Sequence, residues 1–402
     1  MALGTGRTFV GAIVVLGTLA CGGSDGTYTD VTVGEDAVET VSNQAPIIAS
    51  FGPDSDIGFA GGTVVWTVVA SDADGDALTY AFSVVPDTLA LMVDGASVSV
   101  TLPADADAVT VTVTVSDGTD SVDSDPALVQ VRSWKIEAAP SALHPDTYYN
   151  AVAFLNEDEG FVVGGSETGD GNVPYVLHFK DGTWTDETQG TSGHLLAVAP
   201  LSPTDVWAAG GGGLARHFDG TSWTSLTVPG GCTHSIFFVA SDNGWMGPAE
   251  AGQSGMRHYT GGDLDDWQTV SLPGHKGIND LEFLTADDGW AVGLAGLAFH
   301  WDGTAWTAVP TPTTKSLTGI TMVSPTLGYA VGTSGTILKW DGTAFAAMTS
   351  GLTSKLSAVA MHSDTEGFIV GANGVIMRLV DSEWVQMPSP TTANLMNLTI
   401  LP

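Results

Sequence analysis

The chain has 402 residues, of which 45 are Asp or Glu and 11 are Lys or Arg, so its formal charge is −34. Such a surface repels phosphate backbones and anionic lipid headgroups, which excludes a protein that binds nucleic acid or lipid by charge. With 51 Gly, 12 Trp and 14% charged residues, the composition favours short strands and tight turns over long charged helices.

The first residues predict export. Arg7 precedes an apolar run at residues 9–19, which has the length of a secretory signal and is too short to span a bilayer permanently. The run leads into "TLACGGSDG", with small residues ahead of Cys21. This segment resembles a bacterial lipoprotein signal, although Leu19 stands two residues before the Cys and not three. The resemblance implies a signal peptide over residues 1–20 and a lipid on Cys21, with plain cleavage near Ala20 as the alternative.

Residues 21–43 are polar and have almost no core-forming pattern, so we expect a disordered tether. The residue after Cys21 is Gly22 and not the Asp that often retains lipoproteins at the inner membrane, which favours the outer membrane or cell surface. Cys232 is then the single remaining cysteine, so neither domain depends on an internal disulfide. We expect it to be a small residue of a turn and not a nucleophile.

Residues 44–132 alternate apolar and polar side chains, as in "TVVWTVVAS" and "AVTVTVTVSDG". Several such runs, separated by Gly, Asp and Pro, predict a β-sandwich. The segments "NQAPII", "SDADGDALTY" and "VTVSDGTDS" resemble the cadherin-like and immunoglobulin-like (Ig-like) modules of bacterial surface proteins. Such modules often bind Ca²⁺ between strand ends.

A calcium site is one interpretation of the turn "DADGD". Asp72, Asp74 and Asp76 offer hard oxygen ligands at alternate positions around a Gly, and Asp117 joins them in this hypothesis. The alternative is a solvated acidic turn. No other cofactor is predicted.

From Trp134 onward the chain repeats. The segments "HFKDGTW", "HFDGTSW", "HWDGTAW" and "KWDGTAF" end in an aromatic residue, and these aromatics recur every 39 or 44 residues from Trp184 to Trp384. A "GWAVG"-type strand and a "NAVAF"-type strand precede each of them. Every unit thus supplies four short strands, and Asp-Gly marks a two-residue hairpin between the last two. The shared Asp, Gly and Trp are therefore interpreted as scaffold and not as a catalytic motif.

Four-stranded sheets at this period predict a β-propeller over residues 133–402. The units resemble BNR-repeat propellers, most closely the photosystem II stability and assembly factor family, although the Asp-box order is only partly met. We expect six blades. A seventh is the alternative, because the segments at Ser133 and Leu395 match an outer and an inner strand.

The "NAVAF"-type strand is expected to be innermost, with one apolar and one small-residue face. The apolar face is assigned as Val152, Val198, Phe237, Leu281, Ile320, Val359 and Leu398. On the small face, Asp280 and Glu282 are the exceptions, and we expect them to line the channel. They are candidate ligand contacts, with a cation site, a solvated acid pair and an inverting glycosidase as alternatives.

Two further sets of residues are weighed as sites. Arg216, Arg257 and Arg378 are placed at equivalent positions on separate blades, which argues against a converging sialidase-like clamp. The recurrent histidines are expected to stack near hairpin ends and not to ring a metal; they are His178, His217, His258 and His300.

The sequence therefore predicts a non-enzymatic, lipid-anchored envelope protein that binds a protein or glycan, or assists assembly, at the cell surface. A glycosidase that uses Asp280 and Glu282 is the alternative. A purely structural stalk and cap is the third hypothesis.

Overall fold

The structure, a computed structural model, describes residues 42–136, 147–166, 173–188, 193–229, 231–248, 255–274 and 277–401. The predicted signal peptide, Cys21 and nearly all of the tether lie outside the described residues. The chain divides into two compact units, with the boundary between Trp134 and Lys135. Among the described residues, no helix has the length and apolarity that a membrane crossing requires.

The N-terminal unit consists of two β-sheets. The first has the order β1 (Ile47–Pro53), β3 (Thr63–Ser71), β6 (Ser97–Thr101), β5 (Leu91–Asp94). The second has the order β2 (Ile57–Phe59), β9 (Ala127–Arg132), β7 (Ala108–Ser116), β4 (Thr79–Val85), and β8 (Ser121–Asp123) pairs with β7. Along β7 buried valines alternate with partly exposed residues. Both sheets contribute to one core around Trp66, so they pack face to face as a sandwich.

The C-terminal unit is built from four-stranded antiparallel sheets, six in the described residues, each formed by four consecutive strands. Sheet 1 contains β10 (Thr147–Asn156), β11 (Glu159–Ser166), β12 (Val173–Lys180) and β13 (Thr183–Asp186). Sheet 2 contains β14 (Leu195–Ser202), β15 (Asp205–Gly210), β16 (Leu214–Phe218) and β17 (Trp223–Thr227). Sheet 3 contains β18 (Thr233–Ala240), β19 (Asn243–Pro248), β20 (Met256–Tyr259) and β21 (Trp267–Val270).

The remaining sheets repeat this order. Sheet 4 contains β22 (Ile278–Thr285), β23 (Asp288–Gly293), β24 (Ala298–Trp301) and β25 (Trp306–Val309). Sheet 5 contains β26 (Leu317–Ser324), β27 (Leu327–Gly332), β28 (Ile337–Trp340) and β29 (Phe345–Met348). Sheet 6 contains β30 (Leu356–Met361), β31 (Gly367–Gly371), β32 (Ile376–Val380) and β33 (Glu383–Met387).

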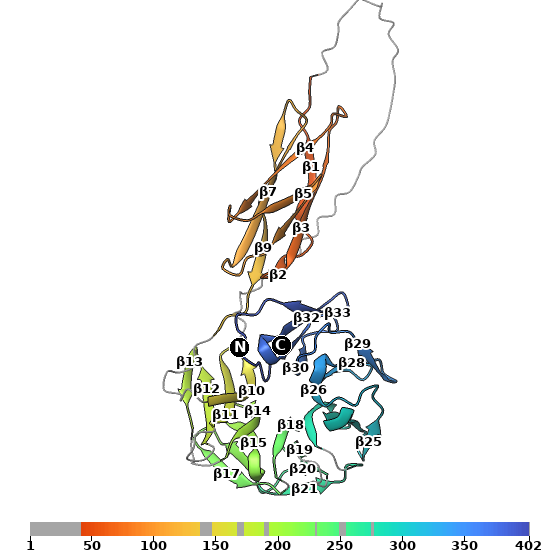
Figure 1. Ribbon diagram of the computed structural model, residues 1–402. Helices are drawn as coiled ribbons and strands as arrows, with labels where there is room; N and C mark the ends of the chain where they lie inside the picture. Colours follow the sequence, from red (N-terminus) through yellow and green to blue (C-terminus); the bar gives the residue numbers. More distant parts are fainter. Residues whose placement is uncertain are drawn as a thin grey trace, which may run out of the picture. The chain divides into compact units, whose positions relative to one another are not determined.

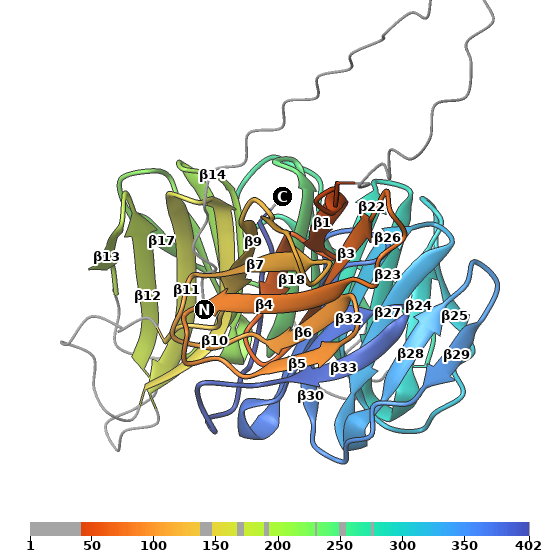
Figure 2. The same ribbon diagram turned by 90° about the horizontal axis from the view of Figure 1, so that it is seen from above.

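The six sheets stand around a common axis, with the first strand of each sheet innermost (Figure 1). Seen from the side, the strands run from one face of this ring to the other (Figure 2). Consecutive inner strands contact one another from β10 through β30. This arrangement is a β-propeller, as the repeat period predicts.

Aromatic rings join neighbouring sheets at their outer ends. In sheets 2 to 6 the ring at the start of the outer strand stands edge-on to a ring on the second strand of the preceding sheet, with centroids 5.4–6.3 Å apart and interplanar angles of 76–89°. The pairs are Trp223 with Phe161, Trp267 with Trp207, Trp306 with Trp245, Phe345 with Trp290, and Trp384 with Tyr329. Edge-to-face pairs of this kind add stability beyond their buried area.

Near the axis, a β-bulge at the start of each inner strand turns one side chain toward the next sheet. Asn150 Nδ2 donates to the carbonyl of Leu195 at 2.8 Å, and Asn279 Nδ2 donates to that of Leu317 at 2.6 Å. The sheets are therefore held together at both their inner and outer ends.

The Asp-Gly hairpins are of two kinds, so the predicted two-residue turn is correct in one sheet only. Asp181 and Gly182 form a two-residue turn, with φ of 47° and 82°. In sheets 2, 4 and 5 the loop has four residues. The Asp side chain accepts hydrogen bonds from the backbone amides of the residues two and three positions further along the chain. In sheet 2, Asp219 Oδ1 accepts the Thr221 hydroxyl and the amides of Thr221 and Ser222. The Thr thus belongs to the loop and does not resume the strand.

The extra strands predicted at the two ends of the repeat are not formed in the described residues 133–136 and 395–401. The Leu395 amide does donate to the carbonyl of Gly371 at 3.0 Å, so the last segment follows sheet 6 where another inner strand would begin. In the described residues no further strand pairs with residues 395–401, so this segment lacks the repeated hydrogen bonds that define a β-strand.

The aromatic seams should dominate the stability of the propeller. Trp306 is 3% exposed, and its indole N–H has no hydrogen-bond partner in the described residues. We expect Trp306→Ala to lower the free energy of unfolding by about 3–5 kcal/mol, and Trp306→Phe by only about 1 kcal/mol. Urea denaturation followed by tryptophan fluorescence measures both. Trp184→Ala is the control, since Trp184 is half-buried, and an equal loss there would contradict the role of the seams.

Candidate functional site

The bulges fix which inner-strand positions are equivalent and correct one prediction. They place Ser235, Asp280 and Gly319 at one position, and Phe237, Glu282 and Thr321 two residues further along. The residue of sheet 3 on the apolar face is therefore Ile236, and the prediction of Phe237 there was wrong. The spacing of 44 residues around this unit hides the shift, because the extra residues cannot be placed from the sequence.

The small face lies against the next inner strand and not along an open channel wall. A Cβ on Gly319 would come within 3.0 Å of Ala358 Cα on β30. Inner strands approach this closely because the sheets converge on the axis. Small residues are therefore required for packing at these positions, and a larger polar side chain must bond to the neighbouring strand.

Asp280 is bonded in this way from three directions. Its Oδ1 accepts the Ser235 hydroxyl and its neighbour Leu281 N–H, both at 2.9 Å. Its Oδ2 accepts the Ile320 N–H of β26 at 2.9 Å. The inner strand is the edge of its sheet, so the Ile320 amide has no strand partner on that side. Asp280 thus satisfies an amide that would otherwise face the axis.

Glu282 makes the same contact one step along the strand. Its Oε2 accepts the Met322 N–H at 3.0 Å, and the Thr321 hydroxyl also bonds to the carboxylate. Both acids keep some solvent exposure, but strand backbone surrounds their carboxylates. Burial raises the pKa of Asp280 to about 6, and burial together with the charge of Asp280 raises the pKa of Glu282 to about 8. At neutral pH the pair therefore carries less than two negative charges.

These contacts weaken the glycosidase hypothesis. A general acid and a general base must each present an oxygen to the sugar and to a water. Here amide donors from β22 and β26 occupy both oxygens of Asp280 and one oxygen of Glu282. The geometry fits a structural pair that caps strand-edge amides, and ligand contact by either residue stays a prediction.

The raised pKa of Glu282 makes stability depend on pH. The folded state binds this proton more tightly than the unfolded chain, so the stabilisation is complete below about pH 4.5 and is lost as the pH rises through about 8. We expect the free energy of unfolding to fall by about 4 kcal/mol between pH 5 and pH 9, and Glu282→Gln to remove most of this fall.

Urea midpoints at pH 5, 7 and 9 measure this dependence. Asp364→Asn is the matched control, since it removes one exposed carboxylate from the same unit. A pH dependence that Glu282→Gln leaves unchanged would contradict the assignment.

The recurrent histidines belong to separate sheets and bond within them. In sheet 2, His217 Nε2 and Trp207 Nε1 share Asp205 Oδ1 at 2.9 and 3.1 Å, and the two rings are in contact. His258 with Asn243, and His300 with Asp288, repeat the arrangement. His178 is buried between Glu159 and Glu187. All four lie near hairpin ends as predicted; His178 and His258 stack on an aromatic ring of the second strand, and His217 and His300 contact one at a tilt. Their bonds hold the second and third strands of sheets 1 to 4 together.

The three arginines are not equivalent, so that prediction was wrong. Arg216 pairs with Ala208 and Arg257 with Met246, whereas Arg378 pairs with Phe368. Arg378 therefore occupies the position of the histidines in sheet 6, and its guanidinium lies 3.5 Å from Glu366. The arginines form no shared clamp.

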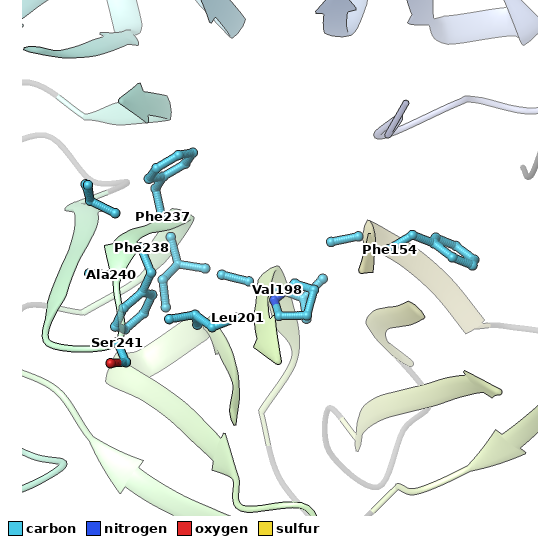
Figure 3. Close-up of a pocket in the computed structure, with 12 residues that line it drawn as sticks. Phe154, Val198, Leu201, Phe237, Phe238, Ala240 and Ser241 are labelled. Atoms are coloured by element: carbon cyan, nitrogen blue, oxygen red, sulfur yellow. The ribbon is translucent and has the colours of Figure 1, made fainter. Parts of the chain in front are cut away.

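An apolar pocket lies where the first three inner strands end (Figure 3). Its volume is about 540 Å³. The lining residues are Ala153, Phe154, Val198, Ala199, Pro200, Leu201, Ile236, Phe237, Phe238, Val239, Ala240 and Ser241. Apolar pockets of this size are the usual sites of ligand binding. The sequence analysis missed it; its one signal is the Phe pair at 237–238, where other units have a small or polar residue at the first position.

The acidic turn of the N-terminal unit brings three of the four predicted calcium ligands together. Carboxylate oxygens of Asp72, Asp74 and Asp76 lie within 4.8 Å of one another. Asp72 Oδ2 is buried and has no hydrogen-bond partner in the described residues, so this oxygen suits a cation ligand. Asp117 lies outside this group and accepts a bond from Asn43 Nδ2 at 2.9 Å. That bond and those from neighbouring residues lower the pKa of Asp117.

A calcium test follows from the unpartnered oxygen. We expect Ca²⁺ to bind the protein and Asp72→Asn to weaken binding at least tenfold, because the buried oxygen would be a ligand. Isothermal titration measures the affinity. Asp94→Asn is the control, and equal binding by both variants would support the solvated acidic turn.

Comparisons with known proteins concern the fold alone. No protein-family model and no curated protein matches this chain. Among solved structures, U3-55K is 9% identical and covers 63% of this chain and 83% of its own, with a TM-score of 0.51. YCF48 bound to D1 peptide is 17% identical and covers 60% and 81%, with a TM-score of 0.49. The WD40 β-propeller domain of Doa1 is 13% identical and covers 51% and 72%, with a TM-score of 0.44.

The class that fold and site define is thus a β-propeller with an apolar pocket at one mouth. At these identities the similarities say nothing about a ligand or an activity. The propeller part of the resemblance seen in the repeats is confirmed at the level of the fold.

Proposed function

We propose that this protein is a non-enzymatic binding protein whose propeller holds a protein partner at the pocket formed by β10, β14 and β18. The observation that carries the proposal is the lining of that pocket, in which Ser241 supplies the one polar side chain. The apolar side chains of the lining favour contact with the side chains of a protein, and the polar surface beside them belongs mainly to strand backbone, which suits the backbone of a peptide. Binding at one mouth of a rigid ring also suits an assembly role.

The second candidate, a glycosidase, is retained as the alternative that Asp280 and Glu282 define. It is disfavoured because amides of the neighbouring strand bond to both carboxylates. Activity would require these acids to exchange backbone partners for a substrate.

The location of the protein is part of the proposal. We propose export by the signal at residues 1–20 and a lipid on Cys21, which would attach the chain to the outer membrane or cell surface. The support is the sequence "TLACGGSDG" and the acidity of the chain. Residues 21–43 would then be a tether, and residues 44–132 an Ig-like or cadherin-like spacer.

We also propose that the propeller has six complete blades. Six sheets of four strands support this number, and residues 395–401 would hold the place of a vestigial seventh. The contact of Leu395 with Gly371 supports the placement of that segment.

Site-specific photo-cross-linking tests the binding function. A photoreactive residue at Ala240, which is exposed in the pocket lining, should capture a defined envelope protein. The same residue at Ala346, exposed on β29 of sheet 5, is the control and should not capture it. Equal capture at both positions, or release of sugar from glycoside substrates that Glu282→Gln abolishes, would contradict the proposal.

A further inference from the structure

The two faces of the propeller differ in charge. In each antiparallel sheet the hairpin after the inner strand and the hairpin before the outer strand lie at the same end, so all of them gather on one face. Exposed carboxylates of these hairpins are Glu157, Asp158, Asp181, Asp219, Asp242, Asp263, Asp265, Asp266, Asp287, Asp302, Asp341, Asp364 and Asp381. We call this the acidic face.

Two of the cations near the acidic face are paired with acids, and a third, Lys339, lies over the ring of Tyr329. Lys180 Nζ lies 3.2 Å from Glu159 Oε1, and Arg378 lies 3.5 Å from Glu366. At the opposite face the described residues carry Lys315 and Lys355, both exposed, with Asp186 and Glu187 as the acids. Among the described residues, the difference in charge between the two faces therefore follows from which loops carry the acids.

The pocket opens on the acidic face. Its three strands run toward their hairpins, and its lining continues to Ala240 and Ser241 at the end of β18. Asp242 follows directly, and Glu157 and Asp158 stand on the hairpin after β10. Exposed acids thus directly follow two of the three strands that line this pocket of about 540 Å³. Figure 3 shows Phe237, Phe238 and Val198 around this cavity.

A bound metal does not account for these acids. Among the described residues, the three-carboxylate group that brings its oxygens together lies in the N-terminal unit and not on the propeller. The turn acids Asp219 and Asp302 are occupied by their own loops, since bonds from Thr hydroxyls and backbone amides lower each pKa to about 2. They stay negative at all physiological pH values. These turn acids therefore contribute fixed negative charge to the acidic face.

We infer that the partner segment held in this pocket is cationic and carries a bulky apolar side chain, an inference that rests on the proposed binding function. The apolar side chain would fill the pocket, where exclusion of water supplies most of the affinity. Flanking Lys or Arg residues would face Asp242, Glu157 and Asp158, where rim charges raise the association rate and select the partner. Acidic or phosphorylated segments would be repelled.

Synthetic peptides test the chemical class. The probe is an amidated heptapeptide, Gly-Lys-Lys-Phe-Lys-Lys-Gly, measured by fluorescence anisotropy against the full protein at low salt. We expect it to bind at least tenfold more tightly than the same peptide with Glu in place of Lys. Replacing its Phe by Ala should weaken binding about fivefold. Raising the salt to 0.5 M should remove most of the preference for charge.

Matched variants locate the site. Asp242→Asn should lower the association rate of the lysine peptide about threefold, and Ala240→Trp, which fills the mouth, should weaken binding about fivefold. Asp364→Asn is the control, because Asp364 is equally exposed on the inner hairpin of sheet 6. Equal effects of Asp242→Asn and Asp364→Asn would overturn the inference, since attraction would then be non-specific.

The two proposals fail separately. If Ala240 cross-links a partner but the glutamate peptide binds as well as the lysine peptide, the binding function stands and the cationic class is wrong. If the lysine peptide binds with the stated preferences, both are supported. If no peptide binds and Ala240 captures nothing, the pocket is not a binding site.

Discussion

The edge-to-face contact between aromatic rings of neighbouring sheets is the constraint on which the propeller depends. A four-stranded sheet has two faces and cannot bury both alone, so each sheet requires a neighbour on either side. The ring at the start of the outer strand meets this need at the rim, as Trp306 does against Trp245. The same geometry recurs at five seams although the rings differ, with Phe345 in one and Trp384 in another. The repeat preserves an aromatic ring at the start of the outer strand, directly after the last hairpin. This explains why the motif ends in Trp or Phe and why the Asp-Gly turn precedes it.

Convergence on the axis creates a second constraint. At the rim the sheets diverge and need large rings, whereas near the axis they approach until a Cβ on Gly319 would press on Ala358. The inner strand is also an edge strand, with amides that have no ladder partner on one side. Asp280 and Glu282 meet both requirements. Each side chain fills the space between two inner strands, and each accepts a hydrogen bond from an unpaired amide of the next strand. Their raised pKa values follow from that burial, so a titration that suggests an active site in isolation here has a structural origin.

The sequence alone predicted the repeat of four strands per unit, but it did not predict which residues of equivalent strands correspond to one another. The recurrence of Trp and Asp-Gly predicted four strands per unit, and the histidines were placed correctly at hairpin ends. Phe237 was assigned to the wrong face because the sequence repeat aligned this unit one residue too far along the chain, and only the pairing of β18 with β19 shows which residues are equivalent. Arg378 was grouped with Arg216 for the same reason, since a one-residue difference in register is invisible without the partner strand. The pocket could not be predicted because residues 153–154, 198–201 and 236–241 meet only when three sheets close around the axis.

The acidity of the chain has different physical meanings at different positions. Asp219 and Asp302 are turn residues, and the hydrogen bonds that shape their loops also hold them ionised. Asp280 and Glu282 are packing residues whose charge is opposed by burial. Asp242 and Asp158 do neither, since their exposed carboxylates accept none of the described side-chain or amide bonds that shape the ring. Asp242 and Asp158 follow strands that line the pocket, so their carboxylates are the ones that can interact with the charge of a bound partner. Net charge alone could not separate these groups, because the distinction lies in which donors each oxygen meets.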